Sequence, residues 1–424
     1  MKTVFSSNCA IDAESELLFL SRLVLGGAVL PGLSVCRKEP LERLAIRHKV
    51  RGLLAASILR TPDVPQQWTV WAMMADMARE RDRQQLEKSL NKAINLIGSI
   101  AEPPIVLKGA SLAFGTPRDE GDIDLLIREK DLLPIIELLE SEGYAYVGYE
   151  RNLYIRKREY RKWEKLKAWS NQFEFKDPES GTLIELHTAL FETARVYEEN
   201  LSRLKNAVSE FMAASATDVE SGNRYLCIED RFLLLALQVV LKRSPVNKSF
   251  ILRHLADYKN LVAQTPDWER LATRARHFGL EFHLAALIAL CERYTGALVP
   301  AEFQTTVNRR LGKRKRWLKD LFCRILIDID SYNRWYSFLY RLSAPLILKG
   351  SLKARVKSLF IVPHALPRAY QLTADYGLPD RSPMIVLLYL LEPMRFTVRV
   401  FLRLRRMVID SVKTRYDRGV KPMG

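Results

Sequence analysis

The chain has 424 residues, 48% of them hydrophobic and 27% charged, which is enough for several ordinary cores and excludes a disordered protein. Its five cysteines form no CxxC or Cys/His cluster, so neither a disulfide framework nor a zinc site is indicated, and a reducing cytoplasm fits best. The formal net charge of +17 belongs to one end, because residues 301–424 hold 25 Lys and Arg against 9 Asp and Glu.

The first hundred residues show helical periodicity. Apolar positions recur at spacings of three and four over 14–24, 41–59 and 67–97, and Thr61-Pro62 marks a break between the last two. Acidic residues precede the first apolar run, which is the wrong charge order for a signal peptide. Since no apolar run reaches the length of about 20 residues that spans a membrane, we expect a cytoplasmic protein without a transmembrane segment.

From residue 105 the pattern changes to short runs that are typical of strands. These runs are "IVL", "DIDLLI", "YAYV", "FEFK" and "TLIELH". One helix is predicted over 131–142, with Asp131 as its N-cap. The letters "KDPESG" predict a hairpin loop between the last two runs, which Gly181 closes. After Leu190 helical periodicity returns and continues into the basic end.

This order of elements predicts an α+β protein, in which a small mixed β-sheet domain is embedded in mostly helical N- and C-terminal parts. We divide the chain into a helical part at 1–100, a sheet domain at 101–215, a helical domain at 216–300 and a basic helical extension at 301–424.

Two aspartates stand one residue apart in the run "DIDLLI". On a strand, residues two apart point to the same face, so Asp122 and Asp124 share one side while Ile123 and Leu125 share the other. Two carboxylates this close repel each other unless a cation lies between them. Mg²⁺ prefers carboxylate oxygens and nucleotide phosphates, so the pair predicts a site for a metal-bound nucleotide.

A third acid would complete such a site. In "TLIELH" the alternation puts Glu185 and His187 on one face, and Glu185 reaches the aspartates if the two strands are neighbours. Glu174 in "FEFK" offers the same local pattern, and spacing alone leaves both open, with Glu185 preferred. We expect His187 to be a hydrogen-bonding residue beside the site rather than a catalytic residue.

Paired aspartates also occur in haloacid dehalogenase phosphatases and in nucleotide-sugar glycosyltransferases, but neither explains the small-residue turn at 109–111. The order "KGAS", "GDIDLLI" and a later acidic strand resembles the DNA polymerase β nucleotidyltransferase superfamily. More narrowly, "VLKGASLA", "GDIDLLI", "LLESEGY", "IELH" and "DWERLATRARHFGL" are similar, in this order, to nucleotidyltransferase family five, over roughly residues 15–300.

The resemblance implies a polymerase β-like domain that transfers a nucleoside monophosphate from an NTP to an acceptor hydroxyl with the help of Mg²⁺ or Mn²⁺. It implies Asp122, Asp124 and Glu185 as the metal ligands and catalytic residues. Through its relatives it also implies a role in natural-product or polysaccharide biosynthesis. The expected acceptor is then a small molecule, a peptide or a protein.

The turn upstream of the aspartates suits a triphosphate. Gly109 and Ala110 leave room for phosphates to approach backbone N–H groups, Ser111 offers a hydroxyl, and Lys108 adds a positive charge. The sequence departs from the family pattern at Ala110, where a second glycine or serine is common, and at 119–120, where two extra acids precede the aspartate pair.

The basic end suggests a polyanionic partner. The cluster "RRLGKRKRW", residues 309–317, is of the kind that contacts phosphates, and residues 395–413 fit a helix lying on an anionic membrane surface. A charged outer face over a helical core explains the same residues equally well. Two alternatives to a biosynthetic enzyme therefore stay open: a transferase that acts on RNA, and an inactive scaffold that binds a partner or a membrane.

Overall fold

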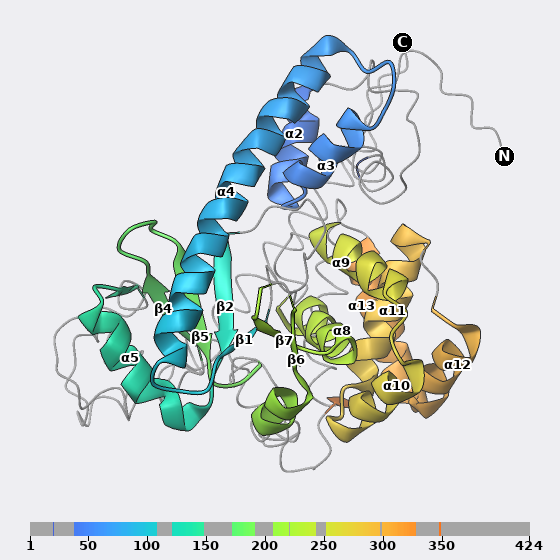
Figure 1. Ribbon diagram of the computed structural model, residues 1–424. Helices are drawn as coiled ribbons and strands as arrows, with labels where there is room; N and C mark the ends of the chain where they lie inside the picture. The colour runs from blue at the N-terminus through green and yellow to red at the C-terminus, as the bar shows by residue number, and fades with distance from the viewer. Residues whose placement is uncertain are drawn as a thin grey trace, which may run out of the picture. The chain divides into compact units, whose positions relative to one another are not determined.

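Figure 1 shows the computed structural model of the chain. It describes residues 20, 38–107, 121–147, 172–190, 207–219, 221–242, 252–296, 299–327 and 347–348. The helices and strands named below all belong to one compact unit, which is formed by residues 1–148 and 163–340. Among the described residues, no helix is both long and apolar enough to cross a membrane.

In the described part of the chain from residue 38 on, three helices precede the sheet. They are α2 (Lys38–Arg47), α3 (Arg51–Leu59) and α4 (Gln66–Gly98), and α3 packs against both of the others. The single helical stretch predicted over 41–59 is wrong in one respect, because the chain turns between α2 and α3 with Lys49 at a φ of 54°. Pro65 precedes α4, where its fixed φ suits a helix start. The helix predicted over 14–24 lies outside the described residues, apart from Leu20.

The sheet is mixed, as expected, and has the strand order β3-β4-β5-β2-β1-β7-β6 in the described part of the chain. Its strands are β1 (Ile105–Val106), β2 (Asp122–Leu126), β3 (Ala145–Tyr146), β4 (Gln172–Lys176), β5 (Leu183–His187), β6 (Ala216–Thr217) and β7 (Arg224–Tyr225). The pairs β2–β5 and β1–β7 are parallel, and the other four pairs are antiparallel. The five strands predicted from the sequence are β1 to β5, and they are consecutive neighbours in this sheet, with β2 next to β5.

Helix α5 (Leu132–Ser141) connects β2 to β3. Asp131 stands at its N-cap position, as expected, but its side chain accepts no capping hydrogen bond. The reason is the 3-10 turn Glu129–Asp131, which runs directly into the helix and gives Asp131 helical backbone angles. The predicted helix is therefore confirmed, whereas its side-chain cap was wrong.

The three longest strands are apolar on one face and polar on the other. The apolar face consists of residues that are almost fully buried: Ile123, Leu125, Phe173, Phe175, Ile184 and Leu186. The opposite face carries Asp122 and Asp124 on β2, acidic, amide and imidazole side chains on β4 and β5, and one leucine at the end of each parallel strand, Leu126 and Leu183. Alternation in three neighbouring strands thus separates a core layer from a mostly polar layer.

Helix α4 lies on the apolar side and is fixed to the β4–β5 hairpin. The Ser89 hydroxyl donates to Asp177 Oδ2 at 2.8 Å and lies 3.4 Å from the Thr182 hydroxyl, at the loop end of the two strands. Burial favours a higher pKa for Asp177, but hydrogen bonds from Ser180, from the Glu179 N–H and from Ser89 outweigh it and hold the pKa below its usual value. Gly181 closes this hairpin with a φ of 72°, as predicted.

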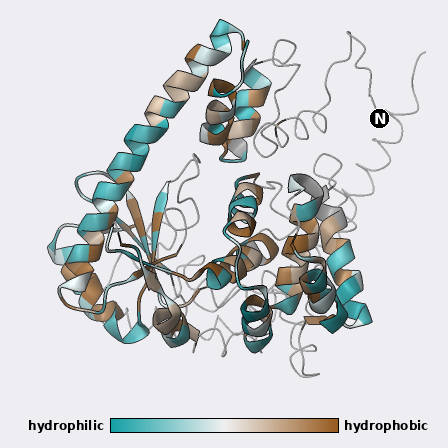
Figure 2. Ribbon diagram, turned by 45° about the vertical axis from the view of Figure 1, so that its right-hand side comes forward, coloured by the Kyte–Doolittle hydropathy of each residue, from teal (hydrophilic) through white to brown (hydrophobic). Residues whose placement is uncertain are grey.

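The second half of the described chain is a group of helices around α11. They are α8 (Ile228–Leu237), the π-helical turn Gln238–Lys242, α9 (Leu252–Ala263), α10 (Trp268–His277), α11 (Glu281–Thr295), α12 (Ala301–Arg310) and α13 (Lys313–Ile327). Helix α11 contacts α8, α9, α10, α12 and α13. Figure 2 shows hydrophobic residues through the sheet and these helices, whereas much of α4 is hydrophilic.

Two features fix the ends and contacts of these helices. Asp267 caps α10, because its side chain accepts the Arg270 N–H at 2.9 Å. The buried Asp230 of α8 accepts two hydrogen bonds from Arg274 of α10, at 2.5 and 2.8 Å. The guanidinium of Arg274 also lies over the rings of Phe211 and Phe278.

Candidate metal and nucleotide site

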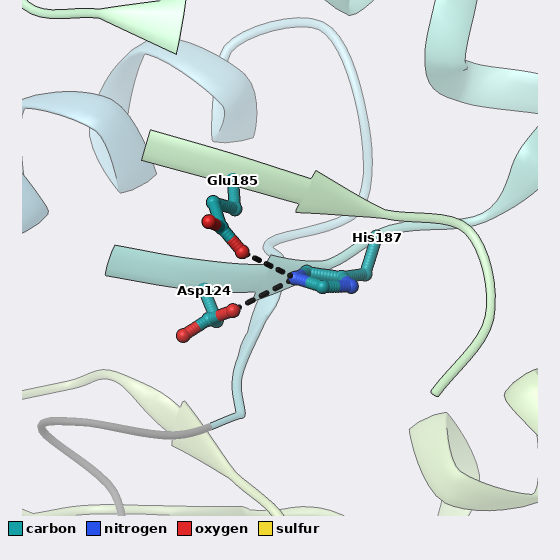
Figure 3. A group of neighbouring side chains, drawn as sticks. All are labelled: Asp124, Glu185 and His187. Atoms are coloured by element: carbon teal, nitrogen blue, oxygen red, sulfur yellow. Dashed lines mark hydrogen bonds and ion pairs between the residues drawn. The ribbon is translucent and has the colours of Figure 1, made fainter. Parts of the chain in front are cut away.

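The candidate site lies on the polar face where β2 and β5 run in parallel. In this pairing Asp124 stands opposite Glu185, and Leu126 stands opposite His187. Because residues opposite each other share a face of the sheet, both carboxylates and the imidazole project to the same side. Figure 3 shows the three side chains pointing toward one another, Asp124 from β2 and the other two from β5.

His187 contacts both carboxylates. Its Nε2 forms a hydrogen bond with Oδ1 of Asp124 at 2.8 Å and lies 3.4 Å from Oε2 of Glu185. One candidate ligand atom from each of the three residues lies within 4.8 Å of the others. Asp124 is 0% exposed, His187 3% and Glu185 9%. Charged groups are seldom buried like this unless they are paired or bind a cation, so the cluster suits a metal ion.

Neighbouring residues orient Glu185. Gln172 of β4 donates its side-chain N–H to Oε2 of Glu185 at 2.6 Å. In the β4–β5 register, Gln172 stands opposite His187 and Glu174 stands opposite Glu185. The two candidates for the third acid are therefore neighbours on the same face, with Glu185 directly beside Asp124 and Glu174 one strand further away.

The other predicted residues lie at the edges of this cluster or beyond the described chain. Asp122 stands on β2 opposite Leu183, on the same face as Asp124, and is partly exposed. The predicted phosphate-binding residues Lys108, Gly109, Ala110 and Ser111 lie outside the described residues, as do Asp119 and Glu120. The described chain before them ends at Leu107, whose N–H donates to the carbonyl oxygen of Asp124 at 2.9 Å.

Sequence reasoning predicted one neighbour of the carboxylates and missed another. His187 was expected as a hydrogen-bonding residue beside the site, and this is confirmed by its hydrogen bond with Oδ1 of Asp124, while its Nε2 also lies 3.4 Å from Oε2 of Glu185. Gln172 was not singled out at all, although it holds Glu185. The alternation in "TLIELH" indicates the face of His187, whereas the role of Gln172 follows only from the β4–β5 register.

Comparison with known proteins adds one match. The model of a protein family described as an uncharacterised nucleotidyltransferase matches residues 37–296, which include every residue of this cluster. No curated protein and no solved structure matches the chain.

Proposed function

Because the chain belongs to this family of uncharacterised nucleotidyltransferases, we propose that it transfers a nucleoside monophosphate from an NTP to an acceptor hydroxyl. In this proposal Asp122, Asp124 and Glu185 hold a divalent cation, Mg²⁺ or Mn²⁺, and are the catalytic residues. The observation that carries the proposal is the parallel register of β2 and β5, which brings Asp124 and Glu185 together on the polar face.

The donor set fits such a cation. Carboxylate oxygens are the ligands that Mg²⁺ and Mn²⁺ prefer, and here two of them come from adjacent strands of one sheet, which fixes their separation. A bound divalent cation would neutralise triphosphate charge and lower the pKa of the acceptor hydroxyl. Gln172 keeps one oxygen of Glu185 aimed at the cluster through its hydrogen bond of 2.6 Å.

The hydrogen bond from Leu107 to Asp124 supports a role for the segment that follows in sequence. It fixes Leu107, the residue before 108–111, next to the aspartate strand. We propose that Lys108, Gly109, Ala110 and Ser111 bind the β- and γ-phosphates there through backbone N–H groups, the Ser111 hydroxyl and the Lys108 charge. The α-phosphate would then face Asp122 and Asp124, which orients it for in-line attack and release of pyrophosphate.

A transfer assay tests this function. The purified chain is incubated with each NTP labelled at the α-phosphate, with Mg²⁺ or Mn²⁺ and with fractions of cell extract, RNA or protein as acceptors. We expect label on one acceptor class and a loss of about 10²–10³-fold in Asp124→Asn. Glu129→Gln removes the same charge from an exposed position five residues away and serves as the control. Equal transfer by Asp124→Asn and wild type would disprove the proposal.

The acceptor we propose first is a biosynthetic small molecule, peptide or protein. RNA is the alternative, and one described surface favours it. We call this surface the basic cluster: Arg309, Arg310, Lys313, Arg314 and Arg316, all exposed where α12 ends and α13 begins. Trp317, also exposed, could stack on a base. The segment 395–413, which suggested a membrane surface, lies outside the described residues.

RNA binding has a clear signature. Contacts from the basic cluster to phosphates release counterions, so the affinity for RNA would fall steeply as salt rises. Replacing Arg309, Arg310 and Arg314 by Gln should lower the affinity and flatten this salt dependence. If nucleotide transfer to RNA is absent and the variant binds RNA as tightly as wild type, the RNA alternative is excluded. Tight nucleotide binding without transfer to any acceptor would instead favour the inactive scaffold.

A further inference from the structure

We infer that His187 is a direct metal ligand through Nε2, and that the site therefore binds a first-row transition-metal ion such as Mn²⁺ in preference to Mg²⁺. The inference rests on the proposed function in one respect, since it uses the same pair of carboxylates, Asp124 and Glu185. It goes further because it adds a nitrogen ligand and predicts which class of cation the site selects.

The position of the imidazole is the first argument. Ligand atoms around one six-coordinate cation, at bond lengths of about 2.0–2.2 Å, are about 3 Å from their neighbours. Nε2 of His187 lies 2.8 Å from Oδ1 of Asp124 and 3.4 Å from Oε2 of Glu185, which brackets that separation. Nε2 is thus spaced from each carboxylate oxygen as neighbouring ligands of one ion are, and a cation that binds there would replace its hydrogen bond with Asp124 (Figure 3).

The rigidity of the arrangement is the second argument. Asp124 and Glu185 are fixed by the β2–β5 register, and His187 follows Glu185 by two residues on the same strand, so all three share one face. Gln172 donates to Oε2 of Glu185, which is also the oxygen nearest to His187. Gln172 is therefore a positioning residue, which holds the carboxylate oxygen where the imidazole and the carboxylate can ligate together.

The third argument is ligand chemistry. Mg²⁺ is a hard cation that favours oxygen ligands and keeps several waters, whereas imidazole nitrogen suits transition metals. A set of two carboxylates and one imidazole therefore adds affinity for Mn²⁺, Co²⁺ or Zn²⁺ that Mg²⁺ does not share. A site that uses Asp122 in place of His187 would have oxygen ligands alone and would lack this preference.

Pulsed electron paramagnetic resonance can detect the nitrogen ligand without nucleotide and without turnover. The full chain, freed of metal by a chelator and carrying no histidine tag, is titrated with Mn²⁺, and the loss of the free-ion signal gives the dissociation constant. Electron spin echo envelope modulation then reports whether ¹⁴N is bound to the ion. We expect ¹⁴N modulation in the wild type, a change to the ¹⁵N pattern after [¹⁵N]histidine labelling, and weak competition by Mg²⁺.

Two variants assign the signal. His187→Asn should lose the ¹⁴N modulation and weaken Mn²⁺ binding about 10–100-fold, while Mg²⁺ binding changes less. His277→Asn, at an exposed histidine of α10, is the control and should behave as wild type. If His187→Asn does not fold, the labelled wild-type protein still decides whether a histidine nitrogen is bound. Mn²⁺ bound without nitrogen modulation, no Mn²⁺ binding up to millimolar concentration, or equal competition by Mg²⁺ would overturn the inference.

These results are independent of the transfer assay. A chain that binds Mn²⁺ through His187 but transfers no nucleotide would keep this inference and remove the proposed function. A chain that transfers nucleotide with Mg²⁺ and gives no histidine signal would do the opposite.

Discussion

Glu185 stands directly opposite Asp124 in the parallel pairing of β2 with β5, and Glu174 stands opposite Glu185 one strand further out. The strand order β4-β5-β2 therefore ranks the two candidates for the third acid, because, of these two glutamates, only Glu185 is a cross-strand neighbour of Asp124.

Substituting each glutamate by glutamine tests this ranking. Glu185→Gln should lower kcat/KM for transfer of labelled nucleotide by about 10²–10³-fold, because it removes a ligand of the proposed cation, which would neutralise the triphosphate. Glu174→Gln has the same change of charge and shape on the neighbouring strand, and should lower kcat/KM less than about tenfold. A larger loss in Glu174→Gln than in Glu185→Gln would make Glu174 the third acid.

The hydroxyl of Ser89 should contribute measurably to stability. It joins α4 to Asp177 in a buried position, so Ser89→Ala leaves a buried carboxylate with one hydrogen bond fewer. We expect the free energy of unfolding in urea to fall by about 1–3 kcal/mol. Lys92→Ala removes an exposed ion pair between the same two elements, from Lys92 to Glu179, and should change the unfolding midpoint little. Equal effects of the two substitutions would contradict the buried hydrogen bond as the cause.

Removing only one partner of the ion pair between Asp230 and Arg274 should lower the stability of the protein strongly. Burial raises the pKa of Asp230 and Arg274 counteracts it, so Arg274→Met leaves a buried carboxyl without its partner. We expect a loss of about 3–5 kcal/mol in the free energy of unfolding. Much of it should return in the double variant Asp230→Leu with Arg274→Met, because an apolar pair can replace a buried ion pair.

Arg270 provides the control for this ion pair. It lies on the same helix, is about half exposed and reaches Glu229 only at 3.7 Å. Arg270→Met should change the free energy of unfolding by less than about 1 kcal/mol. A single variant Arg274→Met as stable as Arg270→Met would mean that the helices α8 and α10 do not depend on the buried pair.

His283 should make the protein sensitive to acid. Burial, with a smaller effect from Lys315, lowers the pKa of this imidazole to about 3, and neither ring nitrogen has a hydrogen-bond partner in the described part of the chain. The unfolded chain binds a proton at this residue below pH of about 6.5, whereas the folded protein does not until about 3. Stability from this residue is therefore present above pH 6.5 and is lost as pH falls, by about 1.4 kcal/mol per pH unit.

Thermal unfolding between pH 7 and pH 4 measures this effect. His283→Leu should flatten the dependence on pH, because an apolar side chain in the same buried place binds no proton. His277→Asn, at an exposed histidine, should leave the slope as it is in the wild type. A slope that is unchanged in His283→Leu would assign the acid sensitivity to other residues.

The sequence predicted the local features of the site and left the long-range ones open. Alternation in "DIDLLI" and "TLIELH" correctly predicted two strands, each with one polar face, since period two is visible within five residues. The choice between Glu185 and Glu174 depends on which strand pairs with β2, and that is settled by contacts between residues more than 60 positions apart. The contacts of His187 with both carboxylates also depend on the pairing of β5 with β2.

Two local errors have simple physical causes. The break between α2 and α3 passes through Lys49, a residue type that carries no turn signal, although its φ is 54°. The missing side-chain cap at Asp131 results from the 3-10 turn that leads into α5. The binding of a triphosphate by residues 108–111 stays a prediction, which the transfer assay can test. The division of the chain into four parts also stays a prediction, which limited proteolysis can test.

The two faces of the sheet make correct assembly and the proposed activity inseparable. If β5 paired with β2 one residue out of step, Glu185 and His187 would turn into the aliphatic layer beneath α4, and Ile184 and Leu186 would face the proposed nucleotide site. Such a molecule would be both unstable and inactive, so misassembled chains cannot persist as a weakly active population. The fraction of active molecules in a preparation should therefore report directly on the fraction that has formed this strand pair.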